Sequence, residues 1–494
     1  MKAKLTANNK FVIGDIDKRI YGSFIEHAGR AVYGGIYEPT HPAADDMGFR
    51  GDVLELIKKL NVPMVRYPGG NFVSGYNWED GTGDKSKRPK RMDLAWFVTE
   101  TNEIGIDEFQ EWARRANIDI MMAVNLGSRD AYAARNCLEY CNSISDTYYA
   151  NMRRQNGFKE PFGIKVWCLG NEMSGSWQIG HTSAAEYGRR AAEAAKIMKW
   201  TDPSIEVVAC GSTTYSSKTF GEWELEMLEH AYNYIDYVSL HQYYGNKEDD
   251  APKFLGKSED MNEYIKSAVA ICDAVKAKKK AKKTINLSFD EWNVWYHSGP
   301  WDTHERWTQS PPQLEDVYNF EDALLVGCML MTLQNNCDRV KMACLAQLVN
   351  VIAPIMTEDG GKAWAQTIFY PYMYASLYGN GTAMRTVTES DTYSVKARQN
   401  IPYLASSVIY NNEIGEIIVY AVNRSLDENM ELEIELQGFG ECKLIEHTEL
   451  YCNDLKAIND KDTERVAPRK VDIGNGDIVI LKKHSWNMLR YKLK

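Results

Sequence analysis

IKVWCLGNE, residues 164–172, is a short run of apolar and β-branched side chains that ends at a polar pair, Asn171 and Glu172. Its apolar residues are nearly continuous, which is typical of a strand buried on both faces of a parallel sheet. Similar runs occur along the chain at IYGSFIE (20–26), PMVRYPG (63–69), IDIMMAVNLG (118–127), IEVVACGS (205–212), YVSLHQYY (237–244), INLSFDEW (285–292) and RVKMACLAQ (339–347). The sequence therefore predicts eight buried strands.

Amphipathic segments with helical spacing separate these strands. The clearest are DVLELIKKLN (52–61), DEFQEWARRAN (107–117), SAAEYGRRAAEAAKIMKW (183–200) and MNEYIKSAVAICDAVKAKKKAKK (261–283). Strands that alternate with helices in this way predict an α/β fold of the (β/α)8 TIM barrel type. The alternative is an open, doubly wound sheet. Such a sheet normally carries G-x-G-x-x-G after its first strand, and IYGSFIEHAGR lacks that pattern.

The pattern changes after about residue 375. MELEIEL (430–436) alternates apolar and acidic residues, which is typical of a strand with one solvent-exposed face. Turn residues recur at the spacing expected for a β-sandwich. We therefore expect a catalytic barrel over residues 17–378 and a tightly packed sandwich domain over residues 379–494, which the N-terminal strand 1–16 joins.

Composition and charge exclude several classes of protein. Hydrophobic residues make up 44% and charged residues 25% of the 494 positions, the usual balance of a globular chain. The net charge of −11 argues against general nucleic-acid binding, which needs a basic face. The N-terminus has no apolar secretory segment, and ALLVGCMLMTL (323–333) is too short to span a membrane. With ten scattered cysteines, expected to be reduced thiols, these features predict a cytoplasmic protein.

Polar side chains follow each predicted strand, where (β/α)8 enzymes carry their active sites. An unpaired buried polar group costs about 1–3 kcal/mol, so a shared polar pocket explains these residues better than core packing does. The groups at the strand ends include Glu26, His27, Asn71, Asn125, Asn171, Glu172, Ser212, His241, Tyr243, Asp290, Glu291, Asn293 and Gln347.

Two of these residues, Glu172 and Glu291, match the chemistry of glycoside hydrolysis. That reaction needs one carboxylic acid to protonate the leaving oxygen and one carboxylate to attack the sugar or to activate water. The fourth and seventh strands that carry them lie three apart around an eight-stranded ring, so their carboxyl groups can converge. We expect His241 and Tyr243, from the neighbouring sixth strand, to orient Glu291. Asn171 is placed to bind a sugar hydroxyl.

Other kinds of active site are weakly supported. No H-E-x-x-H or H-x-H pattern indicates a metal site, and no G-x-S-x-G pattern indicates a nucleophilic serine. We therefore predict neither metal nor cofactor. Aromatic rings near the predicted pocket suit a sugar, which has C–H faces and hydroxyl edges, although about half of them are expected in the core. They are Phe24, Trp78, Trp96, Trp177, Trp292, Trp295, Tyr296 and Trp301.

Long motifs in the correct order resemble the intracellular α-L-arabinofuranosidases of glycoside hydrolase family 51. They are IYGSFIEHAGRAVYGGIYEP, VRYPGGNFVSGYNWEDGTG, KVWCLGNEM, VSLHQYYGNKED, LSFDEWNVWYH and CLAQLVNVIAPI, and the resemblance runs from about residue 18 to 380 and more weakly beyond. It implies a retaining exo-glycosidase with a jelly-roll-like sandwich domain. It also implies a cytoplasmic enzyme, commonly a homohexamer, that acts on arabinose-containing oligosaccharides such as arabinan and arabinoxylan fragments.

The resemblance also implies individual roles. Glu172 of the G-N-E motif corresponds to the general acid/base, and Glu291 of D-E-W-N corresponds to the nucleophile. His241 matches a residue near the nucleophile. The residues implied to bind the arabinofuranosyl hydroxyls are Glu26, Asn71, Asn171, Tyr243 and Gln347, and those implied to contact the leaving saccharide are Trp96, Trp177 and Trp295. After G-N-E-M the family often has Asp-Gly-Pro-Trp, whereas residues 174–177 here are SGSW, so the preference for the leaving saccharide is in doubt.

Three other functions stay open at this point. A related endo-acting glucanase or xylanase would need an open groove rather than a closed pocket. A non-catalytic sugar-binding protein would have no use for both Glu172 and Glu291. A nucleic-acid or protein scaffold is disfavoured by the charge and by the polar strand ends.

Overall fold

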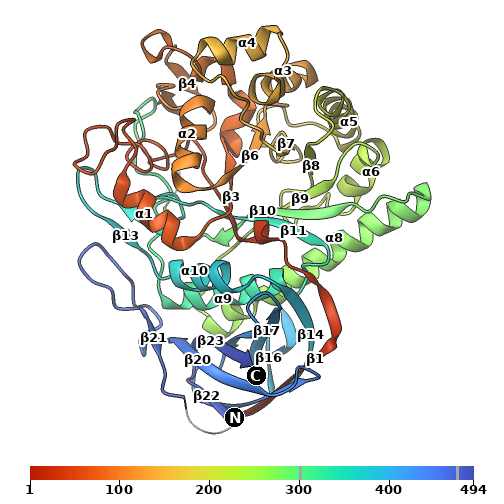
Figure 1. Cartoon of the computed structure of the whole chain (residues 1–494), viewed down its shortest axis with the longest axis vertical. Helices are drawn as coiled ribbons and strands as arrows, with labels where there is room; N and C mark the ends of the chain where they lie inside the picture. The colour runs from red at the N-terminus through yellow and green to blue at the C-terminus, as the bar shows by residue number, and fades with distance from the viewer. Residues whose placement is uncertain (300–302, 474–477) are drawn as a thin grey trace.

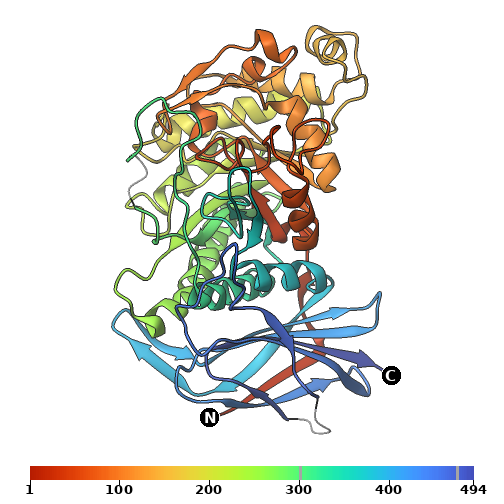
Figure 2. The same ribbon diagram turned by 90° about the vertical axis from the view of Figure 1, so that its left-hand side faces the viewer.

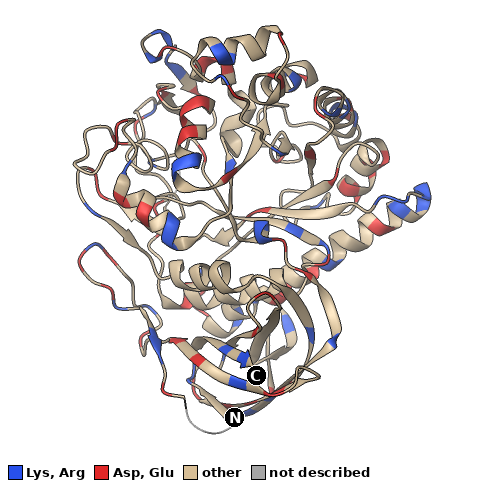
Figure 3. Cartoon of the chain, in the orientation of Figure 1, with Lys and Arg blue, Asp and Glu red and all other residues tan. Residues whose placement is uncertain are grey.

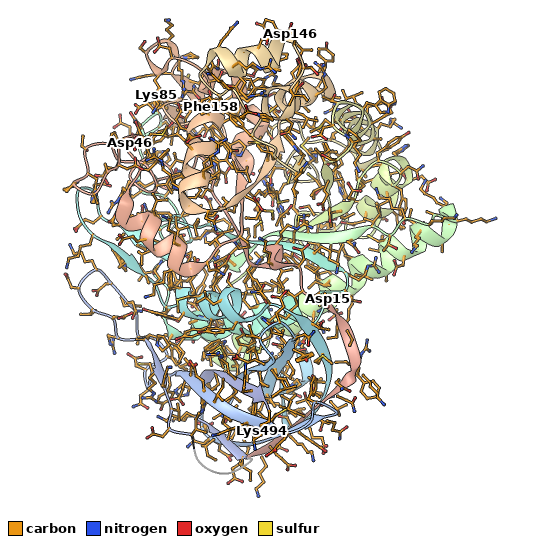
Figure 4. All side chains as sticks on the ribbon, in the orientation of Figure 1. Asp15, Asp46, Lys85, Asp146, Phe158 and Lys494 are labelled. Carbon is orange, nitrogen blue, oxygen red and sulfur yellow. The ribbon has the colours of Figure 1, made fainter. Side chains whose placement is uncertain are left out.

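The computed structural model describes residues 1–299, 303–473 and 478–494. The chain forms two parts that lie one above the other in Figure 1, a barrel surrounded by helices and a strand-rich C-terminal part that also holds both termini. Asp15, labelled in Figure 4, lies where the N-terminal strand leaves the C-terminal part and the chain enters the barrel.

The barrel is closed, and neighbouring strands in it pair in parallel around the ring. Each of the eight predicted runs supplies one strand, so the predicted (β/α)8 fold is confirmed and the doubly wound alternative is wrong. The strands are β2 (Gly22–Phe24), β3 (Met64–Tyr67), β6 (Asp119–Val124), β7 (Val166–Leu169), β8 (Glu206–Cys210), β9 (Tyr237–Tyr244), β10 (Asn286–Val294) and β11 (Val340–Ala346).

Helices cover the outside of the barrel (Figure 2). The four predicted segments form α1 (Gly51–Leu60), α2 (Ile106–Ala116), α5 (Ala184–Thr201) and α8 (Lys257–Lys279). Six further helices are α3 (Ala131–Asn142), α4 (Tyr148–Gln155), α6 (Glu222–Ala231), α7 (Ala251–Leu255), α9 (Phe320–Gln334) and α10 (Phe369–Tyr378). Short 3-10 turns are η1 (Lys18–Tyr21), η2 (Asn71–Gly75), η3 (Trp78–Gly81) and η4 (Lys85–Lys87). Among the described helices, none has the length and apolar character that crossing a bilayer requires.

The C-terminal part is one nine-stranded sheet in the order β21-β20-β23-β18-β17-β14-β1-β19-β22. A single apolar cluster joins strands from distant places in this order, which shows that the sheet folds over its own core. The two layers expected of a sandwich therefore belong to one continuous sheet. Its strands are β1 (Lys2–Asp15), β14 (Thr382–Ser390), β17 (Leu404–Asn411), β18 (Glu416–Asn423), β19 (Met430–Gln437), β20 (Cys442–Leu450), β21 (Pro468–Lys470), β22 (Ile478–Leu481) and β23 (Ser485–Leu493).

The N-terminal strand β1 lies inside this sheet, antiparallel to β14 and parallel to β19. Strand β19 begins with the predicted alternation, since Met430 and Leu432 are buried whereas Glu431 and Glu433 are exposed. Helix α10 ends at Tyr378 and β14 begins at Thr382. The division at residues 378 and 379 stays a prediction.

Helices α9 and α10 lie between the barrel and the sheet (Figures 1 and 2). Helix α9 is buried along its whole length, as expected for a helix that is apolar on all sides. A Cβ atom on Gly327 of α9 would lie 2.4 Å from the ring of Trp486 in β23, so the close approach of helix and sheet requires glycine there. The barrel and the sheet are therefore packed tightly through α9.

Two-stranded ribbons extend from both parts. They are β4 (Arg91–Asp93) with β5 (Val98–Glu100), β12 (Ile355–Thr357) with β13 (Ala363–Ala365), and β15 (Thr392–Val395) with β16 (Arg398–Pro402).

All ten cysteines are free thiols, and eight of them are buried. Basic and acidic side chains are interspersed over both parts, apart from a lysine-rich end of α8 (Figure 3).

Candidate active site

Glu172 and Glu291 converge at the carboxyl end of the barrel. Glu172 lies just after β7, and Glu291 lies within β10. One carboxylate oxygen of Glu172 lies within 4.8 Å of one carboxylate oxygen of Glu291. Retaining glycosidases hold their two carboxyl groups about 5–5.5 Å apart, whereas inverting enzymes leave about 6.5–9.5 Å for a water molecule. The observed separation is therefore on the retaining side.

The backbone and the neighbours of Glu172 fix its carboxylate. Glu172 has a φ of 43°, in the left-handed region that non-glycine residues rarely adopt, and such strain concentrates at functional sites. Trp177 Nε1 donates a hydrogen bond to Oε2 at 2.9 Å, and His241 Nδ1 lies 3.0 Å from Oε1. The Glu172 side chain is 12% exposed, so it faces solvent on one side only.

Glu291 is held by two strong donors. Arg66 donates from one terminal nitrogen to Glu291 Oε1 at 2.6 Å, and the Tyr243 hydroxyl donates to Oε2 at 3.0 Å. Arg66 also donates to Asn171 Oδ1 at 2.6 Å, so one buried guanidinium connects Glu291 to the residue that precedes Glu172. Asn171 Nδ2 in turn lies 3.4 Å from Asn71 Oδ1.

His241 lies among three carboxylates. Its Nε2 is 3.0 Å from Asp290 Oδ1, and its Nδ1 is 3.0 Å from Glu172 and 3.5 Å from Glu291. Burial lowers the pKa of His241, but the surrounding carboxylates, Glu291 first, outweigh it and raise the pKa to about 10. The imidazole is therefore charged at neutral pH and donates a proton from each nitrogen.

Asp290 holds His241 through a hydrogen bond to its Nε2 atom. Burial favours its neutral form, but the bond from His241 and the charge of Arg66 lower the pKa of Asp290 below the usual value. Ser239 Oγ also donates to Asp290. An ionised Asp290 fixes the orientation and the charge of the imidazole.

Glu26 follows strand β2 at the same end of the barrel. Its Oε1 accepts hydrogen bonds from Phe72 N at 2.8 Å and Trp96 Nε1 at 2.9 Å, and its backbone N–H donates to Gln347 Oε1 at 2.9 Å. Burial raises the pKa of Glu26 to about 8. A Cβ on Gly70, which has a φ of 39°, would lie 2.1 Å from Glu26 Oε2, so the approach of this carboxyl group requires glycine.

The structure brings part of the predicted polar set together around Glu172 and Glu291, whereas Asn125 donates to Tyr76 O and Ser128, His27 bonds to Glu100 and Tyr67, and Asn293 donates to backbone carbonyl groups. Two partners of the site residues have no role in the sequence analysis. The sequence pattern predicts Arg66 only as part of a buried strand, although an arginine inside an apolar run signals a buried ion pair. The sequence places Asp290 at the end of its strand and gives it no role. It lies next to Glu291 and points to His241 instead.

The predicted aromatic residues divide between core and site. Trp78 and Trp292 are buried in the core, as expected for about half of them. Trp96 is 8% exposed, Trp295 37% and Trp177 59%, so Trp177 and Trp295 present open ring faces. Trp301 lies outside the described residues.

Glu172, His241 and Glu291 are also the one set of donor atoms within the described residues that is close enough for a metal ion. In the structure, Glu172 and His241 bond to each other, and Glu291 accepts hydrogen bonds from Arg66 and Tyr243. These residues are therefore arranged for proton and hydrogen-bond chemistry.

Known proteins match this chain over its full length. The family model described as "Alpha-L-arabinofuranosidase 1 domain" matches residues 56–266, and "Alpha-L-arabinofuranosidase C-terminal domain" matches residues 290–485. The intracellular exo-α-(1→5)-L-arabinofuranosidase 1 of Bacillus subtilis is 54% identical over 99% of both chains. The chain belongs to the α-L-arabinofuranosidase family.

Other members of the family agree with this assignment. The intracellular exo-α-(1→5)-L-arabinofuranosidase of Halalkalibacterium halodurans is 55% identical over 99% of both chains. The solved structure of a family 51 α-L-arabinofuranosidase from Bifidobacterium longum superimposes with a TM-score of 0.96 at 43% identity, covering 99% of each chain. A bifunctional glucanase–xylanase shares only the fold, with a TM-score of 0.61 at 13% identity. The α-L-arabinofuranosidase resemblance seen in the sequence is confirmed.

Proposed function

We propose that this protein is a retaining exo-α-L-arabinofuranosidase that releases terminal, non-reducing α-L-arabinofuranosyl residues from oligosaccharides. The observation that carries the proposal is the approach of the Glu172 and Glu291 carboxylate oxygens to within 4.8 Å. Membership of the α-L-arabinofuranosidase family supports the choice of sugar. The endo-glucanase or xylanase alternative has only a shared fold in its favour.

Glu291 is the proposed nucleophile. Its ionised oxygen attacks the anomeric carbon and forms a glycosyl ester while the bond to the leaving oxygen breaks. Arg66 and the Tyr243 hydroxyl hold the two oxygens of Glu291 in place. The carboxylate therefore faces the sugar with little freedom to rotate.

Glu172 is the proposed general acid and base. It donates its proton to the leaving oxygen in the first step and takes a proton from water in the second, when that water releases arabinose from Glu291. The charged His241, which bonds to Glu172 and lies near Glu291, stabilises negative charge on whichever carboxylate carries it. Trp177 Nε1 fixes the other oxygen of Glu172.

The remaining predicted residues are proposed to recognise the substrate. Residues with polar groups around the carboxylates are proposed to bind the furanosyl hydroxyls, and open aromatic rings are proposed to contact the leaving saccharide. The hydroxyl-binding set is Glu26, Asn71, Asn171, Tyr243 and Gln347, and the aromatic set is Trp96, Trp177 and Trp295. The relatives from B. subtilis and H. halodurans are named for α-(1→5) bonds, and we propose the same preference here.

We further propose that the enzyme works in the cytoplasm, on arabinose-containing oligosaccharides from arabinan and arabinoxylan, as a homohexamer. The names of the relatives, which call them intracellular, support the location. Size-exclusion chromatography with light scattering measures the assembly directly.

Hydrolysis of aryl glycosides that differ only in the sugar tests the proposal. We expect turnover of the α-L-arabinofuranoside and little of the matching xylopyranoside or glucopyranoside. Glu291→Ala should abolish turnover, whereas azide should restore activity to Glu172→Ala, because azide attacks the anomeric carbon of the glycosyl ester in place of water, releases Glu291 as the carboxylate and needs no general base. Full activity of Glu291→Ala, or cleavage of internal bonds in a polymer in preference to the aryl substrate, contradicts the proposal.

A further inference from the structure

A second pocket adjoins the candidate active site. It has a volume of about 310 Å³, within the range of roughly 300–1,000 Å³ found for small-ligand sites. Its wall includes Tyr243, whose hydroxyl bonds to Glu291, and Trp295, whose ring lies edge-on to Tyr243 with 5.4 Å between centroids. Residues 245–248, helix α7 and the start of α8 form the rest of it. One aromatic side chain therefore separates this pocket from the proposed nucleophile.

Three of the four charged residues that line this pocket are lysines, of which Lys253 is paired with Glu248 and Lys257 with Asp260. Lys247, Lys253 and Lys257 line it, and Glu248 is the one acidic residue among the described lining residues. Lys253 Nζ donates to Glu248 Oε1 at 2.8 Å. The pKa of Glu248 is lowered by Lys253 first and then by Lys396 and Lys257, so several ammonium groups act on one carboxylate here.

The Glu248 carboxylate is easily exchanged for another. Its side chain is 72% exposed, and an ion pair at such a position contributes little to stability because water and salt screen it. Lys247 has no ion pair among the residues that the structure describes. The pocket thus holds a carboxylate of the chain's own loop on lysines that a ligand carboxylate can also reach.

We infer that this pocket binds the carboxylate of a uronic acid residue in the leaving saccharide. The inference rests on the proposed function, which puts the leaving saccharide on the side of Trp295. The ring of Trp295, 37% exposed, offers a face for sugar C–H groups, and the lysines beyond it offer cations for an acid group. A neutral sugar uses the ring alone, whereas a uronate uses both.

Two matched disaccharides test this inference. In one, the terminal arabinofuranosyl residue is linked to galactose, and in the other to the same position of galacturonic acid, which differs only in the carboxylate. We expect the acidic disaccharide to have a KM about 3- to 10-fold lower, from the gain of one or two partly screened ion pairs. Added salt should reduce this ratio.

Two variants test whether the preference for the acidic disaccharide arises in this pocket. Lys247→Gln and Lys253→Gln remove the charge but keep a long polar side chain, and each should reduce the preference for the acidic disaccharide while leaving the KM of the neutral one unchanged. Lys266→Gln is the matched control, since Lys266 is an exposed lysine of α8 outside this pocket. It should keep the preference intact.

The outcomes separate the two proposals. The uronate inference is overturned if the two disaccharides have equal KM values, or if Lys247→Gln and Lys253→Gln leave the preference intact. Hydrolysis of the neutral disaccharide still supports the proposed function in either case. If the unmodified enzyme hydrolyses neither disaccharide nor the aryl arabinofuranoside, the proposed function itself fails. A preference lost in both pocket variants and kept in Lys266→Gln supports the inference.

Discussion

Replacing Arg66 by methionine removes the cation that joins the two halves of the site. Arg66 donates at 2.6 Å to both Glu291 and Asn171, and its side chain is 2% exposed. A hydrogen bond to a charged group contributes about 1.5–3 kcal/mol, so losing the one to Glu291 should lower kcat/KM by about 10- to 150-fold. Breaking a buried ion pair on one side should also lower the free energy of unfolding by about 3–5 kcal/mol.

Steady-state kinetics on an aryl α-L-arabinofuranoside, with urea unfolding in parallel, measure both effects. Arg153→Met is a control, because Arg153 is equally buried but donates to the backbone carbonyl groups of Tyr140 in α3 and Ser143 just after α3. It should lower stability and leave the kcat/KM of the folded enzyme unchanged. Arg66→Lys keeps the positive charge but loses the planar guanidinium that reaches both Glu291 and Asn171. Its kcat/KM should lie between those of the parent enzyme and Arg66→Met. An Arg66→Met enzyme with the parent kcat/KM would refute the role given to this residue.

Three further changes have defined outcomes. Lys456→Met should lower the unfolding free energy by about 1–3 kcal/mol, because Lys456 is the lysine bonded to the fully buried Glu321. Lys456→Arg keeps the charge and should not lower it. Equal urea midpoints for Lys456→Met and the unmodified protein would contradict this prediction. Gly70→Ala should raise KM for the aryl arabinofuranoside strongly by displacing Glu26, and an unchanged KM would show that the loop adapts. Since the folded-state pKa of Glu26 is raised from 4.5 to about 8, the native state binds an extra proton between these values, and stability should fall as pH rises through them. In Glu26→Gln, the urea midpoint should fall less steeply with pH than in the unmodified protein. Parallel plots of urea midpoint against pH for the two proteins would contradict this prediction.

The barrel could be predicted because its strands are short, apolar and followed by polar groups. IKVWCLGNE and INLSFDEW each contain a strand and end near a carboxylate of the site. This regularity comes from burial on both faces of the sheet and from the position of active sites at one end of a barrel. Fold class and the two carboxylates therefore followed from local patterns.

Arg66 and α9 were harder to predict because their setting depends on distant parts of the chain. The charge of Arg66 is stabilised by Glu291, which is 225 positions away. Helix α9 has no polar face because the barrel covers one side and the C-terminal sheet the other. A helix sequence with no apolar periodicity does not reveal which elements of the fold will cover the helix. The order of the nine strands in the C-terminal sheet could not be predicted for the same reason, since it depends on which distant strands pair.

The place of β1 between β14 and β19 has a consequence for biosynthesis. Strand β1 is hydrogen-bonded to Thr382–Ser390 and to Met430–Gln437, which leave the ribosome long after β1 does. The N-terminal segment must therefore stay without its native neighbours until most of the chain has emerged. Contacts between segments so distant in sequence are slow to form, and exposed strand edges invite aggregation meanwhile. Until β14 and β19 are synthesised, β1 has no native partner strand, and we expect the need for chaperones to be greatest in that interval.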